Sequence, residues 1–447
     1  MEAQERSLVQ ASAQAPARPA VTAPSKPAGP KRFIRQQVPD DILHNAELNR
    51  AIAVLPANYN FEIPKTVWRI RQASAKHVAL QFPEGLLMYA CIISDILERH
   101  AGADQCSILG DVTYGACCVD DFSAKALDAD FLVHYGHSCL VPVDVTGIPC
   151  LYVFVDIGID LQHLVETVRL NFPPDTSLAL AGTVQFAASI QSARQQLSQS
   201  FASLAIPQAK PLSPGEVLGC TAPTLPTRTD ALVFVADGRF HLEAIMIANP
   251  TVAVFRYDPY ARLLLREQYD HVGMRRVRRG MVQRARVPGQ RWGVIQGTLG
   301  RQGNPHTFDR VCDLLRKRDI QFMLVLLSEV TPAKLDMMPE VDVWVQVACP
   351  RLSIDWGEGF GKPTLTPYEA FVALGEAPEF WKDEDGQDRQ ADQSASSDVR
   401  EDFVPYPMDY YAKDGGVWSS SYHRQAQRGT AGVQLNSRTL RPVVQTF

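Results

Sequence analysis

The sequence predicts an α/β protein built from three similar parallel-sheet domains, with disordered N- and C-terminal tails. Short apolar runs of strand length alternate with amphipathic helical stripes between about residues 78 and 350. The pattern repeats, because a strand is followed by a turn of small residues three times, at residues 82–85, 181–183 and 296–298. The two ends lack this periodicity: the N-terminal end is rich in Ala, Pro, Gln and Ser, and the C-terminal end in Asp, Gln, Ser and Gly. We therefore predict a disordered tail at 1–38, domains at 39–158, 159–285 and 286–380, and a mostly disordered tail at 381–447.

The first domain opens with an apolar run over residues 78–81, which predicts a strand, and continues into a helical stripe at Leu86, Ala90, Ile93 and Leu97. Residues 131–134 and 151–155 are further buried-strand candidates. Before these two runs, Cys117 and Cys118 follow a Gly-Ala step. The apolar positions that come after this pair predict that the two cysteines open a helix.

The second and third domains repeat the order of strand, turn, helix and further strands. The predicted strands lie at residues 177–182, 231–236, 251–256, 292–297, 322–327 and 343–347, and the predicted helices around 161–168 and 308–315. The Arg-rich stretch at 262–291 lacks interleaved aromatic residues, so we interpret it as a solvated connecting helix rather than a nucleic-acid site.

Length, net charge and cysteine count limit the classes of protein to which this chain can belong. The chain has 447 residues, a formal net charge of −5 and nine cysteines, an odd number that argues against a disulfide framework. No apolar run reaches the roughly 18 residues that span a bilayer. These features predict a cytoplasmic protein in a reducing compartment, with no membrane association and no direct nucleic-acid binding.

One cysteine in each domain lies among Gly, Ala or Pro residues: Cys117, Cys220 and Cys349. No Cys-x-x-Cys pair occurs, so any metal must be gathered from distant parts of the chain. Three thiolates that meet without carboxylates or imidazoles favour soft-metal or iron–sulfur chemistry. Two alternatives stay open, namely a structural zinc module and reduced core thiols. A rival ligand group, His134, His137 and Cys139, is disfavoured because positions i and i+3 of a strand face opposite sides.

Polar loops at strand ends are the expected pocket walls, since ligands of parallel sheets bind beyond the carboxyl ends of the strands. They lie at residues 134–139, 237–239 and 257–260. The glycine-rich loop that begins at Gly297 lies between a strand and a helix, a context that suits a nucleotide or carboxylate. An alternative function is therefore a nucleotide-binding α/β scaffold subunit without a cluster.

Four separated segments resemble the diphthamide-synthesis family, in the family's order: residues 110–121, 133–139, 215–221 and 346–351. The resemblance spans roughly residues 40–380. It implies three similar α/β domains in a pseudo-threefold triangle, each giving one cysteine to a 4Fe-4S cluster, here Cys117, Cys220 and Cys349. Archaeal relatives have Gly-Ala-Cys-Asp at the first position, which aligns Cys117 rather than Cys118 with the ligand.

The resemblance also implies an activity. The enzyme would be a transferase in which the reduced cluster cleaves S-adenosylmethionine to a 3-amino-3-carboxypropyl radical. That radical would add to a histidine of translation elongation factor two, the first step of diphthamide biosynthesis. The implied partners are a related subunit two in a heterodimer, a small iron-containing electron donor and a reductase. No catalytic residue beyond the cluster ligands is expected, and strand-end position assigns S-adenosylmethionine to Gly136, His137, Ser138, Thr183, Asp237, Gly297, Thr298 and Gly300.

Overall fold

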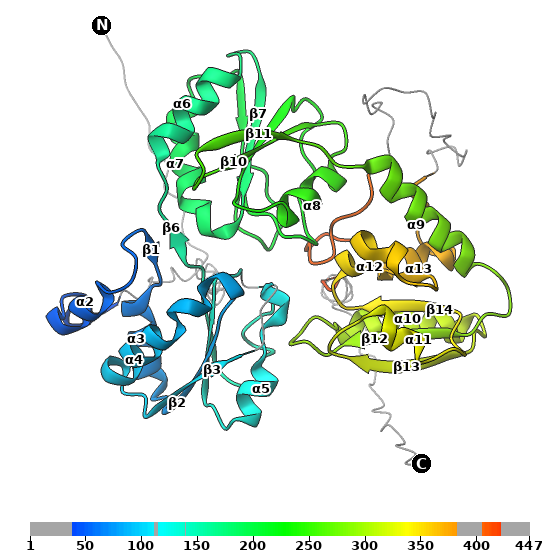
Figure 1. The fold of residues 1–447 in the computed structure, drawn as a ribbon, viewed down its shortest axis with the longest axis horizontal. Helices are drawn as coiled ribbons and strands as arrows, with labels where there is room; N and C mark the ends of the chain where they lie inside the picture. Colours follow the sequence, from blue (N-terminus) through cyan, green and yellow to red (C-terminus); the bar gives the residue numbers. More distant parts are fainter. Residues whose placement is uncertain (1–37, 111–114, 139, 382–404, 422–447) are drawn as a thin grey trace, which may run out of the picture. The chain divides into compact units, whose positions relative to one another are not determined.

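Three sheets, each made from a consecutive stretch of the chain, form the framework of the protein (Figure 1). The computed structural model describes residues 38–110, 115–138, 140–381 and 405–421. The predicted tail at 1–37, the residues 382–404 and 422–447, and Cys139 lie outside the described residues. The α/β class with parallel sheets is confirmed.

The first sheet is parallel throughout. Its strands, in spatial order, are β3 (Gln105–Leu109), β2 (His77–Gln81), β4 (Phe131–Tyr135) and β5 (Cys150–Val153). Helices α3 (Ile63–Ala73) and α4 (Ala90–Ala101) pack together and contact strands β4 and β3. The remaining elements of this part are α1 (Asp40–Leu43), α2 (Ala46–Ile52), β1 (Tyr59–Asn60), η1 (Glu84–Tyr89), η2 (Ala116–Cys118), α5 (Asp121–Ala126) and β6 (Asp156–Ile157), which pairs with β1.

The second sheet has five strands and is parallel except at one edge. Its order is β11 (Leu263–Glu267), β10 (Ala253–Asp258), β9 (Ala231–Val235), β7 (Ser177–Gly182) and β8 (Ser203–Ala205), with β11 antiparallel. Helices α6 (Leu161–Asn171) and α7 (Ala187–Leu197) share one apolar core with this sheet, with η3 (Val184–Phe186) leading into α7. Helix α8 (Phe240–Ala248) belongs to a different core, so it covers the other face.

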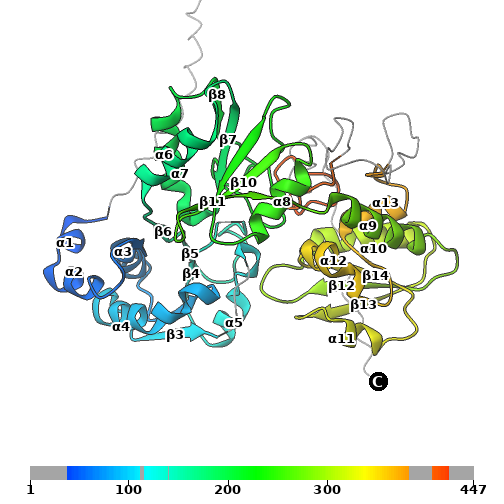
Figure 2. The ribbon, with the colours of Figure 1, turned by 45° about the horizontal axis from the view of Figure 1, so that its top comes forward.

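The third sheet is again parallel, in the order β13 (Phe322–Leu327), β12 (Trp292–Gly297), β14 (Val343–Val347) and β15 (Thr364–Leu365). One face carries α9 (His271–Ala285), α10 (Pro305–Lys317), α12 (Pro350–Trp356) and α13 (Pro367–Ala373), whereas α11 (Pro332–Asp336) lies on the other (Figure 2). The short turn η4 (Gly357–Gly359) follows α12.

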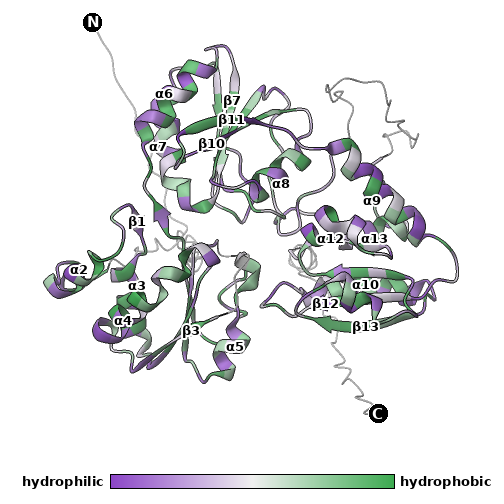
Figure 3. Cartoon of the chain, viewed as in Figure 1, coloured by the Kyte–Doolittle hydropathy of each residue, from purple (hydrophilic) through white to green (hydrophobic). Residues whose placement is uncertain are grey.

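The central strands are buried because helices cover both faces of each sheet. Every residue of β4, β9 and β14 is buried, and their sequences are nearly continuous apolar runs. Edge strand β13 is equally apolar, as its colour in Figure 3 shows, but none of its residues is fully buried. Strand position in the sheet, more than composition, therefore decides burial.

Three local predictions need correction. The cysteines at 117 and 118 do not open a helix; they form the 3-10 turn η2, and α5 begins at Asp121 because the Asp120 side chain caps it. The Arg-rich stretch is not simply solvated, because Arg278 of α9 is fully buried. Residues 405–421 fall in the predicted tail, yet Tyr406, Met408 and Tyr410 belong to the main core.

The domain boundaries stay a prediction. Each predicted domain contains one complete sheet, but all three sheets belong to one compact unit of the fold. Among the described residues, no helix is both long and apolar enough to cross a membrane.

Candidate metal centre

Cys117 lies in the turn after the first sheet's β3. The turn is fixed by Gln81 at the end of β2, whose Nε2 donates to the carbonyl oxygen of Cys118 at 2.8 Å. The same side chain accepts a hydrogen bond from the backbone N–H of Asp120 at 3.1 Å. Strand β2 therefore holds the chain directly after Cys117.

Cys220 lies in a tight loop of the second sheet's domain. Leu218 and Thr221 exchange two backbone hydrogen bonds, of 2.9 and 3.2 Å, and Cys220 lies inside this loop. A side chain at Gly219 would collide with the ring of Phe240, since its Cβ would lie 2.1 Å from the ring. The glycine allows α8, which begins at Phe240, to pack directly on the cysteine loop.

Cys349 follows β14 of the third sheet. It is the residue before helix α12, and Pro350 occupies the first helical position, where its missing N–H costs no hydrogen bond. The Nε2 of Gln346 donates to the Cys349 carbonyl oxygen at 2.9 Å. The third cysteine is thus held by its own strand and by the start of its helix.

Side chains and loops tie the three cysteine segments to one another. The N–H of Arg301, in the loop after β12, donates to the Cys117 carbonyl oxygen at 2.9 Å. The next residue, Gln302, donates from Nε2 to the Cys118 sulfur at 3.1 Å. Arg351, two residues after Cys349, is buried and donates to the carbonyl oxygen of Gly219 at 3.3 Å. The three segments therefore form one connected structure.

The three thiols interact electrostatically. A hydrogen bond with Cys118, burial and the neighbouring thiols raise the pKa of Cys117 well above its ordinary value, and Cys220 and Cys349 are among those neighbours. Burial, with Cys349 nearby, raises the pKa of Cys220 to about 12. Burial raises the pKa of Cys349 to about 11. Three thiolates this close repel each other, so a bound cation is needed to stabilise them together.

Asp121 anchors the first cysteine segment to the third sheet's loop. Its carboxylate accepts two hydrogen bonds from Arg301, at 2.8 and 2.5 Å, and the guanidinium also lies 4.0 Å from the Phe122 ring centre. Burial works to raise the pKa of Asp121, but the hydrogen bonds from Arg301 and Gly147 outweigh it and hold the pKa below its ordinary value. The carboxylate is therefore ionised at neutral pH.

We predict that Asp121→Asn lowers the free energy of unfolding by about 1–2 kcal/mol at pH 7, because a charge-assisted pair is lost. The folded-state pKa is depressed, so this stabilisation is present above the ordinary aspartate pKa of about 3.9 and disappears as the pH falls through the lower, folded value. Urea unfolding of wild type and variant from pH 7 to pH 3 measures it. If the difference in unfolding free energy between wild type and variant stayed the same from pH 7 to pH 3, the ionic interpretation would be contradicted.

A cavity of about 210 Å³ opens beside these segments. Five of the residues predicted to bind a cofactor line it: Gly136, His137, Ser138, Thr183 and Asp237. They come from strand ends of the first and second sheets. Leu218 of the Cys220 loop also lines the cavity, which places it next to the candidate metal centre.

Several polar atoms at this cavity are buried and have no hydrogen-bond partner among the described residues. They are the Ser138 and Thr183 hydroxyl oxygens and the Nδ1 atom of His241. Burial, with His137 and Arg351 nearby, lowers the pKa of His241 to about 3, so its imidazole is neutral at pH 7. Buried polar groups normally find partners, and a ligand in the cavity would supply them.

Tyr59 and His241 are among the cavity residues that were not predicted from the sequence. Their signals were weak, because Tyr59 comes from a two-residue strand outside the repeated pattern, whereas His241 follows the strand-end residue Asp237 by four positions. Tyr59 meets Tyr260 of the predicted 257–260 loop, with their hydroxyls 3.3 Å apart. Two aromatic rings thus contribute to one wall of the cavity.

Gly297, Thr298 and Gly300 do not line this cavity. Gly300 has a positive φ of 53°, and a Cβ there would lie 2.5 Å from the backbone of Cys118. The loop is packed against the first cysteine segment at Gly300, whereas a Cβ at Gly297 would lie 2.7 Å from the Ala348 side chain. Little room is left for the nucleotide that the alternative function requires at this place.

The two histidines of the rival ligand group stay neighbours, with ring centres 5.7 Å apart, but among the described residues they belong to no group of three metal-binding side chains. His134 is fully buried and its Nδ1 lies 2.8 Å from Gln81 Oε1, while His137 lines the cavity. Burial, followed by the proximity of His137, lowers the pKa of His134 well below its ordinary value. Cys139, the third member of this group, lies outside the described residues.

Comparison with known proteins decides the family. A sequence model of diphthamide synthesis proteins matches residues 82–385. The chain belongs to the diphthamide synthesis protein family. It is 52% identical over 404 residues to 2-(3-amino-3-carboxypropyl)histidine synthase subunit 1 of Bos taurus, covering 90% of this chain and 86% of the relative. The human protein of the same name is 52% identical, with 91% and 87% covered.

A solved structure of the family is also similar in fold. The crystal structure of Dph2 from Pyrococcus horikoshii with a 4Fe-4S cluster superposes with a TM-score of 0.59 at 26% identity, covering 72% of this chain and 92% of that one. That archaeal protein thus binds a 4Fe-4S cluster in its crystal structure.

The three cysteines fit such a cluster better than a single ion. Within the described part of the chain, no three His, Cys, Asp or Glu side chains are close enough to hold one metal ion together. One zinc ion needs every sulfur at about 2.3 Å. A cluster of several irons accepts each thiolate at a different iron, so it suits three thiols that interact from separate turns.

Proposed function

We propose that this family member is the catalytic subunit of a transferase that moves a 3-amino-3-carboxypropyl group from S-adenosylmethionine to a histidine of translation elongation factor two, the first step of diphthamide biosynthesis. The observation that carries the proposal is the connection of three cysteine segments, one from each sheet, next to a cavity with unsatisfied polar groups. The names of the relatives support the same reaction.

Cys117, Cys220 and Cys349 would hold a 4Fe-4S cluster. When bound, such a cluster supplies the electron that cleaves S-adenosylmethionine to methylthioadenosine and the aminocarboxypropyl radical. Cys220 is buried, whereas Cys117 and Cys349 are half-buried. We propose the reducing cytoplasm as its compartment, in agreement with the free thiols at all three positions.

The cavity residues would bind and orient S-adenosylmethionine. The carboxylate of Asp237 suits the ammonium of the amino-acid part, and the Ser138 and Thr183 hydroxyls suit polar atoms of the ligand. Tyr59 and Tyr260 offer aromatic surface for a purine ring. The neutral His241 imidazole adds a polar group without the positive charge that would repel a sulfonium.

Thr183→Val is predicted to weaken the binding of S-adenosylmethionine about three- to tenfold, because one hydrogen bond to the ligand is lost without a change of shape. Without ligand the variant should be as stable as wild type, since the hydroxyl has no partner in the protein. Calorimetric titration of the oxidised, cluster-loaded protein measures the affinity. The control is Ser192→Ala, which lies on helix α7 of the same domain but outside the cavity lining. Equal losses of affinity for S-adenosylmethionine in both variants would contradict the assignment.

Activity requires partners that we also propose: a related second subunit, a small iron-containing electron donor and a reductase. The name "subunit 1" of the relatives supports an assembly of several chains. The test combines the reconstituted subunits with dithionite, S-adenosylmethionine and unmodified elongation factor. Formation of methylthioadenosine together with a mass gain of one aminocarboxypropyl group on the factor is expected, and the mass gain should be absent when the target histidine is replaced.

A further inference from the structure

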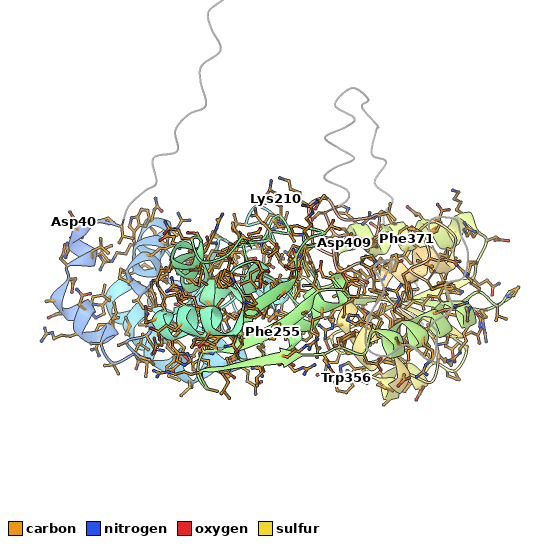
Figure 4. The ribbon with its side chains drawn as sticks, turned by 90° about the horizontal axis from the view of Figure 1, so that it is seen from above. Asp40, Lys210, Phe255, Trp356, Phe371 and Asp409 are labelled. Carbon is orange, nitrogen blue, oxygen red and sulfur yellow. The ribbon has the colours of Figure 1, made fainter. Side chains whose placement is uncertain are left out.

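The segment 405–421, here called the C-terminal strap, lies beyond the region matched by the family model, which ends at residue 385. It is closed on itself by Asp409, whose carboxylate accepts hydrogen bonds from Trp418 Nε1 at 2.6 Å and from the N–H of Gly416 at 2.9 Å. In Figure 4, Asp409 is labelled between Lys210 and Phe371. The strap is therefore a defined structure rather than a loose extension.

The strap is bound to parts of the second and third sheets' domains. The N–H of Lys413 donates to the carbonyl oxygen of Lys210 at 2.6 Å. On the other side, Tyr406 donates to buried Glu369 of α13 at 2.9 Å, and Arg310 of α10 donates to the Ser419 carbonyl oxygen at 2.7 Å. These contacts fix the strap at both of its ends.

Between these ends, the strap runs along the Cys220 loop. Thr221 and Asp409 form an antiparallel bridge, and the N–H of Ala222 donates to the Met408 carbonyl oxygen at 2.8 Å. The N–H of Tyr411 donates to the Thr221 hydroxyl oxygen at 3.1 Å. That hydroxyl in turn donates to the Cys220 sulfur at 3.8 Å. A relay of two hydrogen bonds thus joins the strap backbone to the thiol.

The side chain of Tyr411 lies near the same thiols. Burial, followed by the thiols of Cys117, Cys220 and Cys349, raises the pKa of Tyr411 well above its ordinary value. The N–H of Tyr411, which donates to the Thr221 hydroxyl oxygen, is the contact that joins this part of the strap to the Cys220 loop.

We infer that the C-terminal strap is part of the metal centre, with Thr221 as a positioning residue that the strap backbone holds so that its hydroxyl group is directed toward the Cys220 sulfur of the group held by the three cysteines. The inference deepens the proposed function and rests on it for the identity of that group. Hydrogen bonds to the sulfurs stabilise the more negative, reduced state of a cluster and so raise its reduction potential.

The test compares Thr221→Val and Thr221→Ser in the full chain with its partner subunit. At a fixed potential, the valine variant should hold about tenfold less reduced cluster than wild type, which equals about 59 mV for one electron. Thr221→Ser keeps the hydroxyl and should restore the wild-type value. Tyr406→Phe, which loses a hydrogen bond to Glu369 away from the cysteines, should leave the potential unchanged. An unchanged potential in Thr221→Val at full iron content would overturn the inference.

A second readout needs no cluster, so it separates this inference from the proposed function. Hydrogen–deuterium exchange of the metal-free protein reports on the amide of Tyr411, which the Thr221 hydroxyl protects. Thr221→Val should accelerate exchange in the peptide that contains residue 411, and Thr221→Ser should not. Equal exchange in all three proteins would overturn the relay, whether or not wild type binds iron.

Discussion

Cys117→Ala is expected to yield protein without bound iron, whereas Cys118→Ala should keep most of it. Cys117 interacts with the thiols of Cys220 and Cys349. Cys118 is buried, and its sulfur accepts a hydrogen bond from Gln302 of the loop after β12, as a packing residue does. A cluster with only two protein thiolates is bound too weakly to survive purification, so the loss should be nearly complete.

Iron and sulfide analysis after anaerobic purification measures this difference. The Cys220→Ala and Cys349→Ala variants should match Cys117→Ala, while Cys312→Ala, a core thiol of α10, is the control for the loss of a buried cysteine. Iron retained in Cys117→Ala and lost in Cys118→Ala would reverse the ligand assignment.

Arg278→Met is expected to lower the free energy of unfolding by about 3–5 kcal/mol, because it leaves the Glu369 carboxylate buried without its counter-charge. Both side chains are fully buried. Arg278 donates to both carboxylate oxygens, at 2.7 and 2.6 Å, and also to the carbonyl oxygens of Ser353 and Thr364. This pair joins α9 to α13. Glu369 also accepts a hydrogen bond from Tyr406, the tyrosine that anchors the strap.

Urea unfolding followed by circular dichroism measures the loss, and Glu369→Gln, which keeps the shape but removes the charge, should be intermediate. The control is Arg316→Ala, which breaks the exposed pair with Asp313 and should change stability little. If Arg278→Met and Arg316→Ala were equally stable, the buried pair would not be a stabilising element of this fold.

The repeated pattern of strand, small-residue turn and helix was readable from the sequence because it depends on local periodicity. Strands β2, β4, β9, β12, β13 and β14 lie where the apolar runs predicted them. The edge strand β11 was not predicted, because its Leu-Leu-Leu run lies in an antiparallel edge with Leu263 and Leu265 exposed. Position at an edge is a tertiary property that local periodicity does not encode.

The candidate site likewise has a part that local sequence predicts and a part that depends on tertiary contacts. Gly136, Ser138, Thr183 and Asp237 were predicted to lie at a ligand because they follow strands, and the fold gathers them at one cavity. The Gly297 loop follows a strand too, but it packs on Cys118, a contact between segments almost two hundred residues apart. Likewise, nothing in the polar composition of the last residues predicts a strap, because its burial depends on Cys220, Arg310 and Glu369.

The central claim is that Cys117, Cys220 and Cys349 hold one iron–sulfur cluster. The most direct measurement is the visible spectrum of the wild-type chain, reconstituted anaerobically with its partner subunit, before and after dithionite, together with iron, sulfide and zinc content. A broad absorbance that bleaches on reduction, with equal amounts of iron and sulfide, is the predicted result. Colourless protein would contradict the claim; stoichiometric zinc would then indicate a structural zinc module, and no metal at all would indicate reduced core thiols.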